Sequence, residues 1–598
     1  MLPQSLDLAT LAAAYRQGLK PSTLFADLHA RAQADDHHAW ISLLPEAELL
    51  ARARALDEQD PASLPLYGIP FAIKDNIDLA GLPTTAGCPD FAYLPAADAR
   101  VVARLIAAGA IPLGKTNLDQ FATGLNGTRS PYGACRNAID PAFISGGSSS
   151  GSAVAVAAAQ VSFSLGTDTA GSGRVPAAFN NLVGLKPTCG LLSSTGLVPA
   201  CRSIDTISIF ALSAADAAAV FSVARGFDEA DAYSRPVEAH GRRFPAGEPF
   251  RFGVPRPEQL DYFGDPHNAA LFEAAVARLA ALGGTPVEVD FSPFLDTARL
   301  LYGGPWVAER YHAIKDFIEA QPESVFPVTR EITLGGARAS AVEVFDAQYR
   351  LKALKRRCDA VWQDVDLILT PTAGHHPTIA AVEADPIRIN TDLGYYTNFM
   401  NLLDYSAVAV PAAIRPDGLP FGVTLFAPAH QDMPLLELAG RWQADTRLPV
   451  GATGQVLPAA PAIPEPADNG MVRVAVCGAH LSGLPLNGQL TQRGARLIGA
   501  VRSAPEYRFY ALAGGPPLRP GMVRVAEGGG SVAMEIWELP ARHFGSFVAG
   551  IPAPLGIGKV KLEDGSQVCG FICESGGLAG AEDITALGSW RAWLASRT

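Results

Sequence analysis

The stretch GGSSSGSAVAVAAAQVSFSLGTDTAGSGRVPA, residues 146–177, sets two Gly/Ser-rich loops 24 residues apart, counted from Ser148 to Ser172. An Ala/Val-rich segment joins the loops, and we expect a helix to begin after each of them. Helix N-termini offer backbone N–H groups to a developing oxyanion. Thr169, Ala170 and Gly171 are small enough to let that backbone approach a carbonyl closely. Ser172 therefore lies where nucleophilic attack and oxyanion stabilisation could meet.

Lys74 is the second unusual feature, because it interrupts the apolar run PFAIKDNI at residues 70–77. A lone lysine at a strand end usually extends its ammonium group into solvent. The functional alternative is a neutral, desolvated lysine that can take a proton. The two serine loops favour this alternative. The sequence thus predicts serine nucleophiles activated by a lysine rather than by a histidine.

Composition indicates a large globular enzyme: 598 residues, 48% hydrophobic and 18% charged. The net charge of -12 and the absence of a basic stripe argue against nucleic acid as a partner. No apolar run is long enough to span a bilayer, so we expect no membrane partner. The N-terminal sequence does not resemble a signal peptide. Eight cysteines in such a chain then predict reduced thiols and a cytoplasmic location, and their spacing predicts no metal site.

Alternating strand-like and helix-like patterns predict α/β organisation over roughly residues 65–225. We expect helices over residues 5–57 and again over 294–364, with β-rich segments elsewhere. The Pro- and Ala-rich segment 452–470 is typical of a linker. The predicted domains are therefore 1–451 and 471–598, the second being small and β-rich.

Two pattern matches point to other chemistry. Residues 109–116, GAIPLGKT, fit a phosphate-binding loop, but Gly109 ends an expected helix and Ile111–Leu113 resembles the strand itself. We therefore interpret this segment as a helix-to-strand connection. Residues 147–151, GSSSG, fit the nucleophile elbow of α/β-hydrolases, which would make Ser149 the nucleophile. That elbow requires a strand directly before it, and RNAIDPAFISG is a poor strand, so Ser149 remains the alternative.

At this point the chain resembles the amidase signature hydrolases. The motifs PFAIKDNID, LGKTNLDQFATG, GGSSSGS, GTDTAGSGRVPAAFNNLVGLKPT and LPFGVTL occur in the family's order and spacing over roughly residues 60–445. The resemblance implies the amidase signature fold, a mixed β-sheet core covered by helices. It also implies a Lys74–Ser148–Ser172 triad in which Ser172 attacks and Ser148, following a cis peptide, relays a proton to neutral Lys74. The amides of Thr169, Ala170, Gly171 and Ser172 would form the oxyanion hole.

Within the family, the variant AGSGR and the appended module from about residue 471 are similar to the allophanate hydrolase branch. This implies allophanate as the small-molecule substrate, hydrolysed to release ammonia and carbon dioxide. Tyr302, Arg310 and Gly124 would bind it, because an anionic urea derivative needs an arginine partner. Treating Tyr302 and Arg310 as residues of one helix separates them by about 12 Å, so both would have to reach inward.

The C-terminal module is similar to gamma-glutamylcyclotransferases, but no glutamate stands convincingly at their acid–base position. The module is expected either to assist breakdown of the product, with His480 as candidate, or to serve assembly and stability. His480 follows the apolar run VRVAVCG and enters a Gly-rich turn, where a structural histidine is about as common as a functional one.

The resemblance further implies no metal or organic cofactor, a homodimer, and association with urea carboxylase or other enzymes of urea or triazine breakdown. Two other functions stay open. One is an amidase or transamidase of the same signature acting on another amide, including charged tRNA, against which the acidic charge argues. The other is a catalytically inactive scaffold, which the joint presence of Lys74, Ser148 and Ser172 disfavours.

Overall fold

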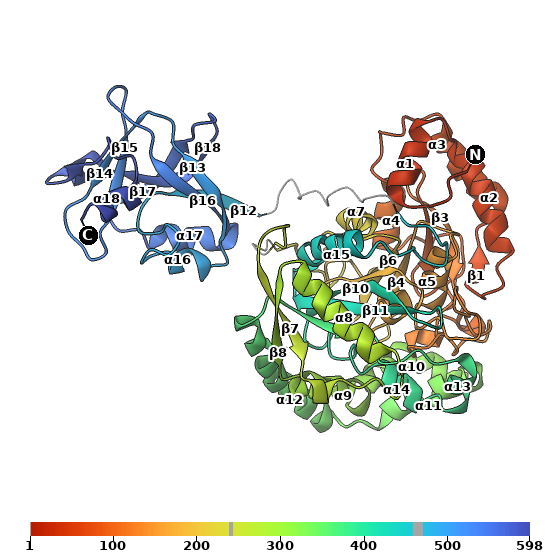
Figure 1. Ribbon diagram of the computed structural model, residues 1–598. Helices are drawn as coiled ribbons and strands as arrows, with labels where there is room; N and C mark the ends of the chain where they lie inside the picture. Colours follow the sequence, from red (N-terminus) through yellow and green to blue (C-terminus); the bar gives the residue numbers. More distant parts are fainter. Residues whose placement is uncertain (1, 239–242, 458–469, 598) are drawn as a thin grey trace. The chain divides into compact units, whose positions relative to one another are not determined.

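The computed structural model describes residues 2–238, 243–457 and 470–597 (Figure 1). The chain divides into two compact units, one of Met1–Val237 with Phe244–Ile463 and the other of Glu238–Arg243 with Pro464–Thr598. Most of the expected linker lies outside the described residues, so the boundaries at 451 and 471 stay predictions.

An eleven-stranded mixed sheet forms the core of the first unit, as the resemblance predicted. Two parallel groups at its sides, β3–β2–β4 and β9–β7–β8, are joined by antiparallel strands. In spatial order the strands are β1 (Trp40–Leu43), β3 (Ile111–Thr116), β2 (Pro70–Lys74), β4 (Phe163–Asp168), β6 (Thr206–Ala211), β5 (Val183–Lys186), β10 (Tyr405–Ile414), β11 (Pro420–Pro428), β9 (Leu367–Pro371), β7 (Phe250–Pro255) and β8 (Gly284–Val289).

The N-terminal expectation of helices throughout residues 5–57 was wrong at one place. Residues 40–43 form β1, which pairs antiparallel with β3 at the edge of the sheet. A four-residue apolar run is compatible with both helical and strand periodicity. Here it forms a strand because it can pair with the open edge of β3. The flanking segments are helical, as expected: α1 (Leu8–Arg16), α2 (Pro21–Gln33) and α3 (Glu46–Asp57).

Helices cover the sheet, and α8 and α15 cross β10 and β11 on the side toward the viewer in Figure 1. Helix α5 is buried on every side, because its residues SGSAVAVA are all small or apolar. A Cβ at Gly151 in this helix would lie 2.1 Å from the Ala39 carbonyl oxygen, so only glycine allows the close approach. The further helices of this part are α4 (Arg100–Ala107), α5 (Ser150–Ala157), α6 (Val175–Phe179), α7 (Ala214–Ala224), α8 (Asn268–Ala281) and α15 (Asp432–Thr446).

The helix-rich region predicted over residues 294–364 is confirmed. Its first two helices are separate: α9 ends at Gly303 and α10 begins at Trp306, after Gly304 and Pro305. Tyr302 and Arg310 are therefore on different helices, and the one-helix estimate of their separation was wrong. The helices here are α9 (Ser292–Gly303), α10 (Trp306–Ala320), α11 (Pro327–Gly335) and α12 (Ala341–Asp359), followed later by α13 (Ile379–Ala384) and α14 (Arg388–Leu393).

The C-terminal unit is β-rich, as expected, with its own apolar core around Trp537, Phe547 and Trp590. Its strands form a five-stranded sheet in the order β13–β16–β12–β18–β17 and a three-stranded sheet in the order β15–β14–β19. The elements are β12 (Met471–Val476), α16 (Gly488–Thr491), β13 (Arg496–Arg502), β14 (Tyr507–Ala511), β15 (Pro520–Arg524), β16 (Ala533–Pro540), α17 (Ala541–Ala549), β17 (Leu555–Lys561), β18 (Gln567–Cys573), β19 (Glu582–Asp583) and α18 (Trp590–Ala595).

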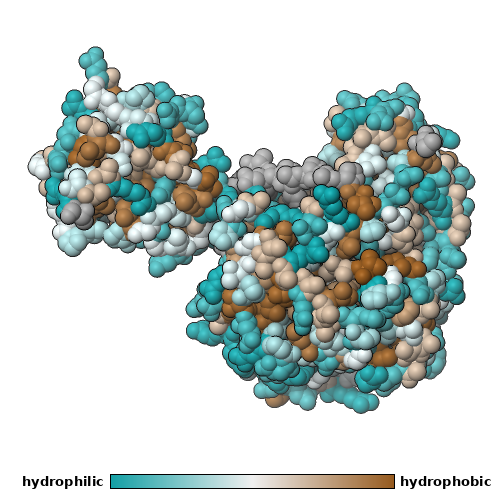
Figure 2. All heavy atoms as spheres, viewed as in Figure 1, coloured by the Kyte–Doolittle hydropathy of each residue, from teal (hydrophilic) through white to brown (hydrophobic). Residues whose placement is uncertain are grey.

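Hydrophilic residues cover much of the face shown in Figure 2, with hydrophobic groups scattered between them. Among the described residues, no helix combines the length and the apolar character needed to cross a bilayer.

Candidate active site

Lys74 and Ser148 are in direct contact, although 74 residues separate them in the chain. The Lys74 Nζ lies 2.7 Å from Ser148 Oγ and 2.6 Å from Thr167 Oγ1. Lys74 ends β2, Thr167 is in the adjacent β4, and Ser148 lies in the loop before α5. All three side chains are buried. The strand order of the sheet thus brings the predicted lysine and the first predicted serine together.

The protonation state of Lys74 is set mainly by burial. Desolvation lowers the pKa of Lys74 from its ordinary value near 10.5 to about 7, against the opposing influence of Asp119 and Asp205. The positive charge of Arg310 lowers it further. No carboxylate among the described residues forms an ion pair with Lys74. A large fraction of Lys74 is therefore neutral near pH 7 and able to accept a proton.

Close packing fixes the loop that carries Ser148. The Gly147–Ser148 peptide bond is cis. A Cβ at Gly147 would lie 2.1 Å from an Asp119 carboxylate oxygen, so the position requires glycine. Asp119 in turn donates its amide to the Ser148 carbonyl at 3.0 Å and accepts the amides of Asn126 and Gly127.

Ser172 lies in the turn between β4 and α6, only 3% exposed. Its hydroxyl makes no hydrogen bond to any described residue. The amides of Thr169, Ala170 and Ser172 are likewise without an acceptor within the described ranges, as an oxyanion hole requires. Gly171 differs: its amide donates to Asp168 Oδ1 at 3.0 Å. The part of the Gly171 amide in the oxyanion hole therefore stays a prediction, since the buried Asp168 carboxylate accepts this amide in the structure.

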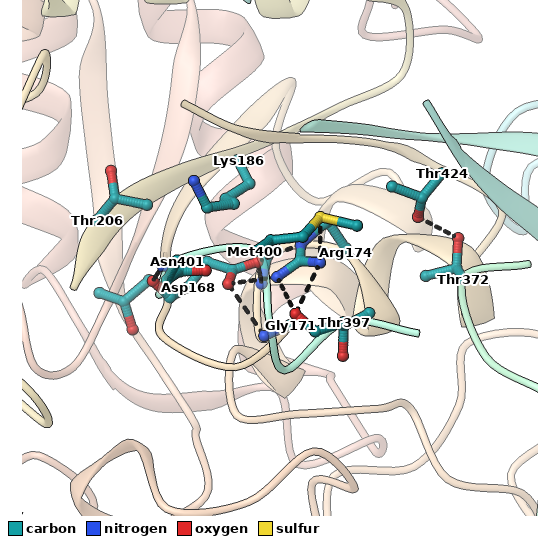
Figure 3. Close-up of polar contacts among 12 residues, drawn as sticks. Asp168, Gly171, Arg174, Lys186, Thr206, Thr372, Thr397, Met400, Asn401 and Thr424 are labelled. Carbon is teal, nitrogen blue, oxygen red and sulfur yellow. Dashed lines mark hydrogen bonds and ion pairs between the residues drawn. The ribbon is translucent and has the colours of Figure 1, made fainter. Parts of the chain in front are cut away.

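Asp168 fixes the shape of this turn (Figure 3). Its carboxylate accepts the amides of Gly171 and Gly173, and Arg174 binds it with two nitrogens at 2.9 Å each. Burial raises the pKa of Asp168, but the Arg174 guanidinium and the hydrogen bonds outweigh it and hold the pKa below its usual value. Asn401 donates to the Asp168 carbonyl at 2.8 Å from the opposite side. The turn is thus held by a charged hydrogen-bond network, in which the Asn401 side-chain oxygen alone among these groups is buried without a partner.

The break between α9 and α10 brings Tyr302 and Arg310 together. Arg310 Nη2 lies 3.4 Å from the Tyr302 hydroxyl, and its guanidinium carbon lies 5.3 Å from the centre of the Tyr302 ring. Arg310 Nη1 donates to the Ala122 carbonyl and to Thr123 Oγ1, both at 3.1 Å. Its Nε is buried without a hydrogen-bond partner, and no carboxylate among the described residues pairs with the guanidinium. Arg310 is 3% exposed and is therefore a buried cation.

Gly124 directly follows Thr123, whose hydroxyl binds Arg310. A Cβ at Gly124 would lie 2.5 Å from an Asp119 carboxylate oxygen. The position therefore requires glycine. Tyr302 thus contacts the Arg310 guanidinium, whereas Gly124 lies against Asp119, which also binds the Ser148 carbonyl.

The alternative nucleophile, Ser149, has a structural role. Its hydroxyl donates to the Thr167 carbonyl at 3.0 Å and accepts the Thr167 amide at 3.1 Å. Ser149 thus clamps the backbone of the residue whose side chain contacts Lys74. No strand directly precedes it, so the elbow of α/β-hydrolases is absent at this place. The segment 109–116 also behaves as interpreted, since Lys115 lies on β3 and pairs with Asp75 at 3.1 Å.

Sequence reasoning missed Thr167, Asp168 and Asp205. The first two stand at the end of the buried strand FSLGTD, where an unpaired carboxylate would be costly. The same cost of burial that singles out Lys74 could have identified Asp168. Asp205 accepts the Thr169 hydroxyl at 2.5 Å and the amides of Ala200 and Cys201. Nothing in the local pattern of Asp205 indicates this contact.

His480, in the C-terminal unit, lines a cavity of about 190 Å³. Its Nε2 lies 3.0 Å from the Gln489 side-chain oxygen, and its ring stacks on Phe571 at 5.0 Å. Burial lowers the pKa of His480, which favours the neutral imidazole. Arg519 lines the same cavity and also a second one of about 570 Å³ beside it. Within the described part of the chain, no three His, Cys, Asp or Glu side chains are grouped so that they could hold a metal ion.

Comparison with known proteins follows the division of the chain. Residues 24–436 match the family described as amidase. The chain belongs to the amidase family. Residues 472–595 of this amidase match the family described as allophanate hydrolase C-terminal domain.

Three similar proteins cover different shares of this amidase. It is 43% identical over 591 residues to the urea amidolyase of Lachancea kluyveri, covering 96% of this chain and 32% of that one. The chain thus spans about a third of that relative's length. The solved allophanate hydrolase of Kluyveromyces lactis matches with a TM-score of 0.82 and 39% identity over 99% of both chains. A glutamyl-tRNA(Gln) amidotransferase subunit from Chloroflexus aggregans is 36% identical over 68% of this chain and 89% of that one.

Proposed function

We propose that this amidase is an allophanate hydrolase. The contact between buried Lys74 and Ser148 carries the proposal, and Lys74 also contacts Thr167, which lies five residues before Ser172 in the chain. Arg310, a buried cation without a carboxylate partner among the described residues, adds the requirement for an anionic substrate. The similarity to urea amidolyase and to a solved allophanate hydrolase supports the same substrate.

The residues of the site act as follows in the proposed reaction. Ser148 passes its proton to the Lys74 lone pair and takes the proton of Ser172, whose oxygen attacks the terminal carbamoyl carbon of allophanate. The amides of Thr169, Ala170 and Ser172 hold the oxyanion. Collapse of the tetrahedral intermediate expels ammonia. The ammonia leaves with a proton that Lys74 returns through Ser148. Water then cleaves the acyl-enzyme and releases N-carboxycarbamate. This product breaks down to two carbon dioxide molecules and the second ammonia.

The test is the ammonia released per allophanate consumed by the full chain, with Ser172→Ala as the inactive control. Two ammonia per substrate without accumulation of urea is the expected result. Hydrolysis of simple amides without turnover of allophanate would retain the Ser172 chemistry and refute the substrate.

A second proposal concerns the C-terminal unit, in which His480 assists the breakdown of N-carboxycarbamate. Its support is the cavity where neutral His480 faces a space also lined by Arg519, which forms no ion pair with any described residue. An anionic product would find a cation and a proton acceptor there. In a His480→Asn variant, allophanate consumption should continue while release of the second ammonia lags behind the first. Unchanged kinetics of both would favour a role in assembly.

The fused relatives suggest the source of the substrate. We propose that this chain works with a urea carboxylase that supplies allophanate, and that it acts as a cytoplasmic homodimer. Sedimentation of the purified chain tests the dimer. The competing transamidase function predicts hydrolysis of glutamine, and its absence would exclude that function.

A further inference from the structure

The turn of residues 200–205 connects the nucleophile turn to the helix that carries Arg310. On one side, Asp205 accepts the Thr169 hydroxyl at 2.5 Å. On the other side, the Glu309 carboxylate accepts the Ser203 amide at 2.6 Å and the Ser203 hydroxyl at 2.7 Å. Glu309 directly precedes Arg310 on α10. One short turn therefore touches both the predicted oxyanion backbone and the predicted carboxylate anchor.

The turn itself is rigid. Asp205 accepts the amides of Ala200 and Cys201, and the Cys201 carbonyl accepts the amides of Ile204 and Asp205 at 3.0 and 2.9 Å. Asn401 adds a bridge, because its side-chain amide donates both to the Ile204 carbonyl and to the Asp168 carbonyl at 2.8 Å. A carboxylate that accepts several donors holds a turn firmly, since charge-assisted hydrogen bonds are the stronger ones.

Arg310 is anchored in two different ways. Its own side chain binds Ala122 and Thr123, and these contacts set the direction of the guanidinium. The Glu309–Ser203 pair instead holds the backbone of α10 near its first turn. Glu309 has no hydrogen bond to Lys74 or to the two serines of the triad. Its hydrogen bonds to Ser203 therefore bear on the site through the position of Arg310, whose charge its carboxylate also favours.

We propose that Glu309, bound to Ser203 in the 200–205 turn, is a positioning residue that sets the substrate length accepted between Ser172 and Arg310. The inference rests on the proposed function of the same site. A substrate carboxylate held by Arg310 must place its amide carbonyl at Ser172 with one fixed spacing. A chain longer by one methylene is then rejected, and pockets of this kind discriminate a methylene by roughly 10- to 200-fold.

Two stable acids measure this length. Malonamate has the skeleton of allophanate with CH₂ in place of NH, and succinamate is one methylene longer. The wild type should prefer malonamate over succinamate in kcat/KM by at least about tenfold. Glu309→Ala should lower that ratio by about tenfold, through a higher KM for malonamate and a gain on succinamate. Glu309→Gln keeps one acceptor oxygen and should lie between the two.

Glu319→Ala is the matched control, because Glu319 is on the same helix and pairs with Lys315 at 2.8 Å, away from the turn. Its selectivity should equal that of the wild type. A selective wild type with an unchanged ratio in Glu309→Ala would overturn the positioning role alone. A wild type active on simple amides but on neither acid nor on allophanate would overturn the proposed function, and the positioning role with it.

Discussion

Two fully buried lysines lie on neighbouring strands of this amidase, and their partners differ. Lys115 on β3 forms an ion pair with Asp75 at 3.1 Å. Lys74 on β2 contacts only the hydroxyls of Ser148 and Thr167 among the described residues. Burial lowers the pKa of both lysines, but at Lys115 the Asp75 carboxylate opposes this directly through an ion pair, whereas Lys74 has only hydroxyl partners. The difference separates a structural lysine from a candidate base.

The state of Lys74 predicts a pH dependence. Because its pKa is lowered to about 7 and the neutral amine is the active form, kcat/KM should fall as pH drops through about 7. The decline should approach about tenfold per pH unit well below that value. A pH profile of allophanate hydrolysis across the neutral range measures it, and a flat acidic limb would contradict a neutral Lys74.

The serines of the two loops predict different outcomes of substitution. Ser172→Ala should abolish acylation, whereas Ser149→Ala loses only the clamp on the Thr167 backbone and should keep a measurable rate. Burst kinetics with an activated amide, or mass spectrometry of the trapped acyl-enzyme, distinguishes them. Loss of acylation in Ser149→Ala with retention in Ser172→Ala would reverse the assignment.

Thr167 should orient the Lys74 lone pair, because its hydroxyl accepts an N–H of the amine and leaves the lone pair for Ser148. Thr167→Val keeps the shape but removes this bond, which is worth about 1 kcal/mol. We expect a several-fold lower kcat together with a shifted acidic limb, and recovery in Thr167→Ser. Equal losses in both variants without a change of the pH profile would indicate a packing effect.

At the scale of elements, the sequence predicted the strands and helices around the site well. PFAIK and IPLGKT are buried strands, and their apolar residues with β-branched neighbours identify them. FSLGTD is also a buried strand, but it was not predicted. The failures have physical causes. Trp40–Leu43 is too short to have a distinct period, and its strand state depends on pairing with β3. The Asp205–Thr169 contact joins segments whose proximity only the folded sheet determines.

The break between α9 and α10, at Gly304 and Pro305, was also not predicted from the sequence, and it brings together the two residues proposed to bind substrate. Because it turns Tyr302 toward Arg310, both should act mainly on binding. Arg310→Lys should raise KM for allophanate by more than about tenfold, since a point charge cannot replace the planar fork. Tyr302→Phe should raise it less, because the 3.4 Å contact is long. Steady-state kinetics tests this, and an effect on kcat alone would contradict it.

At the scale of the whole molecule, the two compact units have separate apolar cores. The sequence could predict the second unit, because a Pro- and Ala-rich segment precedes it and a new β-rich pattern indicates it.

The buried cation Arg310 has a thermodynamic consequence for the entire enzyme. Against the effect of burial, nearby groups including Tyr302 and Asp205 raise the pKa of Arg310 and so favour its charge, but its buried Nε still has no hydrogen-bond partner in the empty enzyme, and an anion bound there would relieve that cost. Malonate at about 100 times its dissociation constant should therefore stabilise the wild type by about 2.7 kcal/mol, seen as a higher melting temperature. Arg310→Met should melt higher than the empty wild type and should not respond to malonate; a lower melting temperature would contradict this. The enzyme should therefore be least stable when the Arg310 site is empty and most stable when an anion is bound there during turnover.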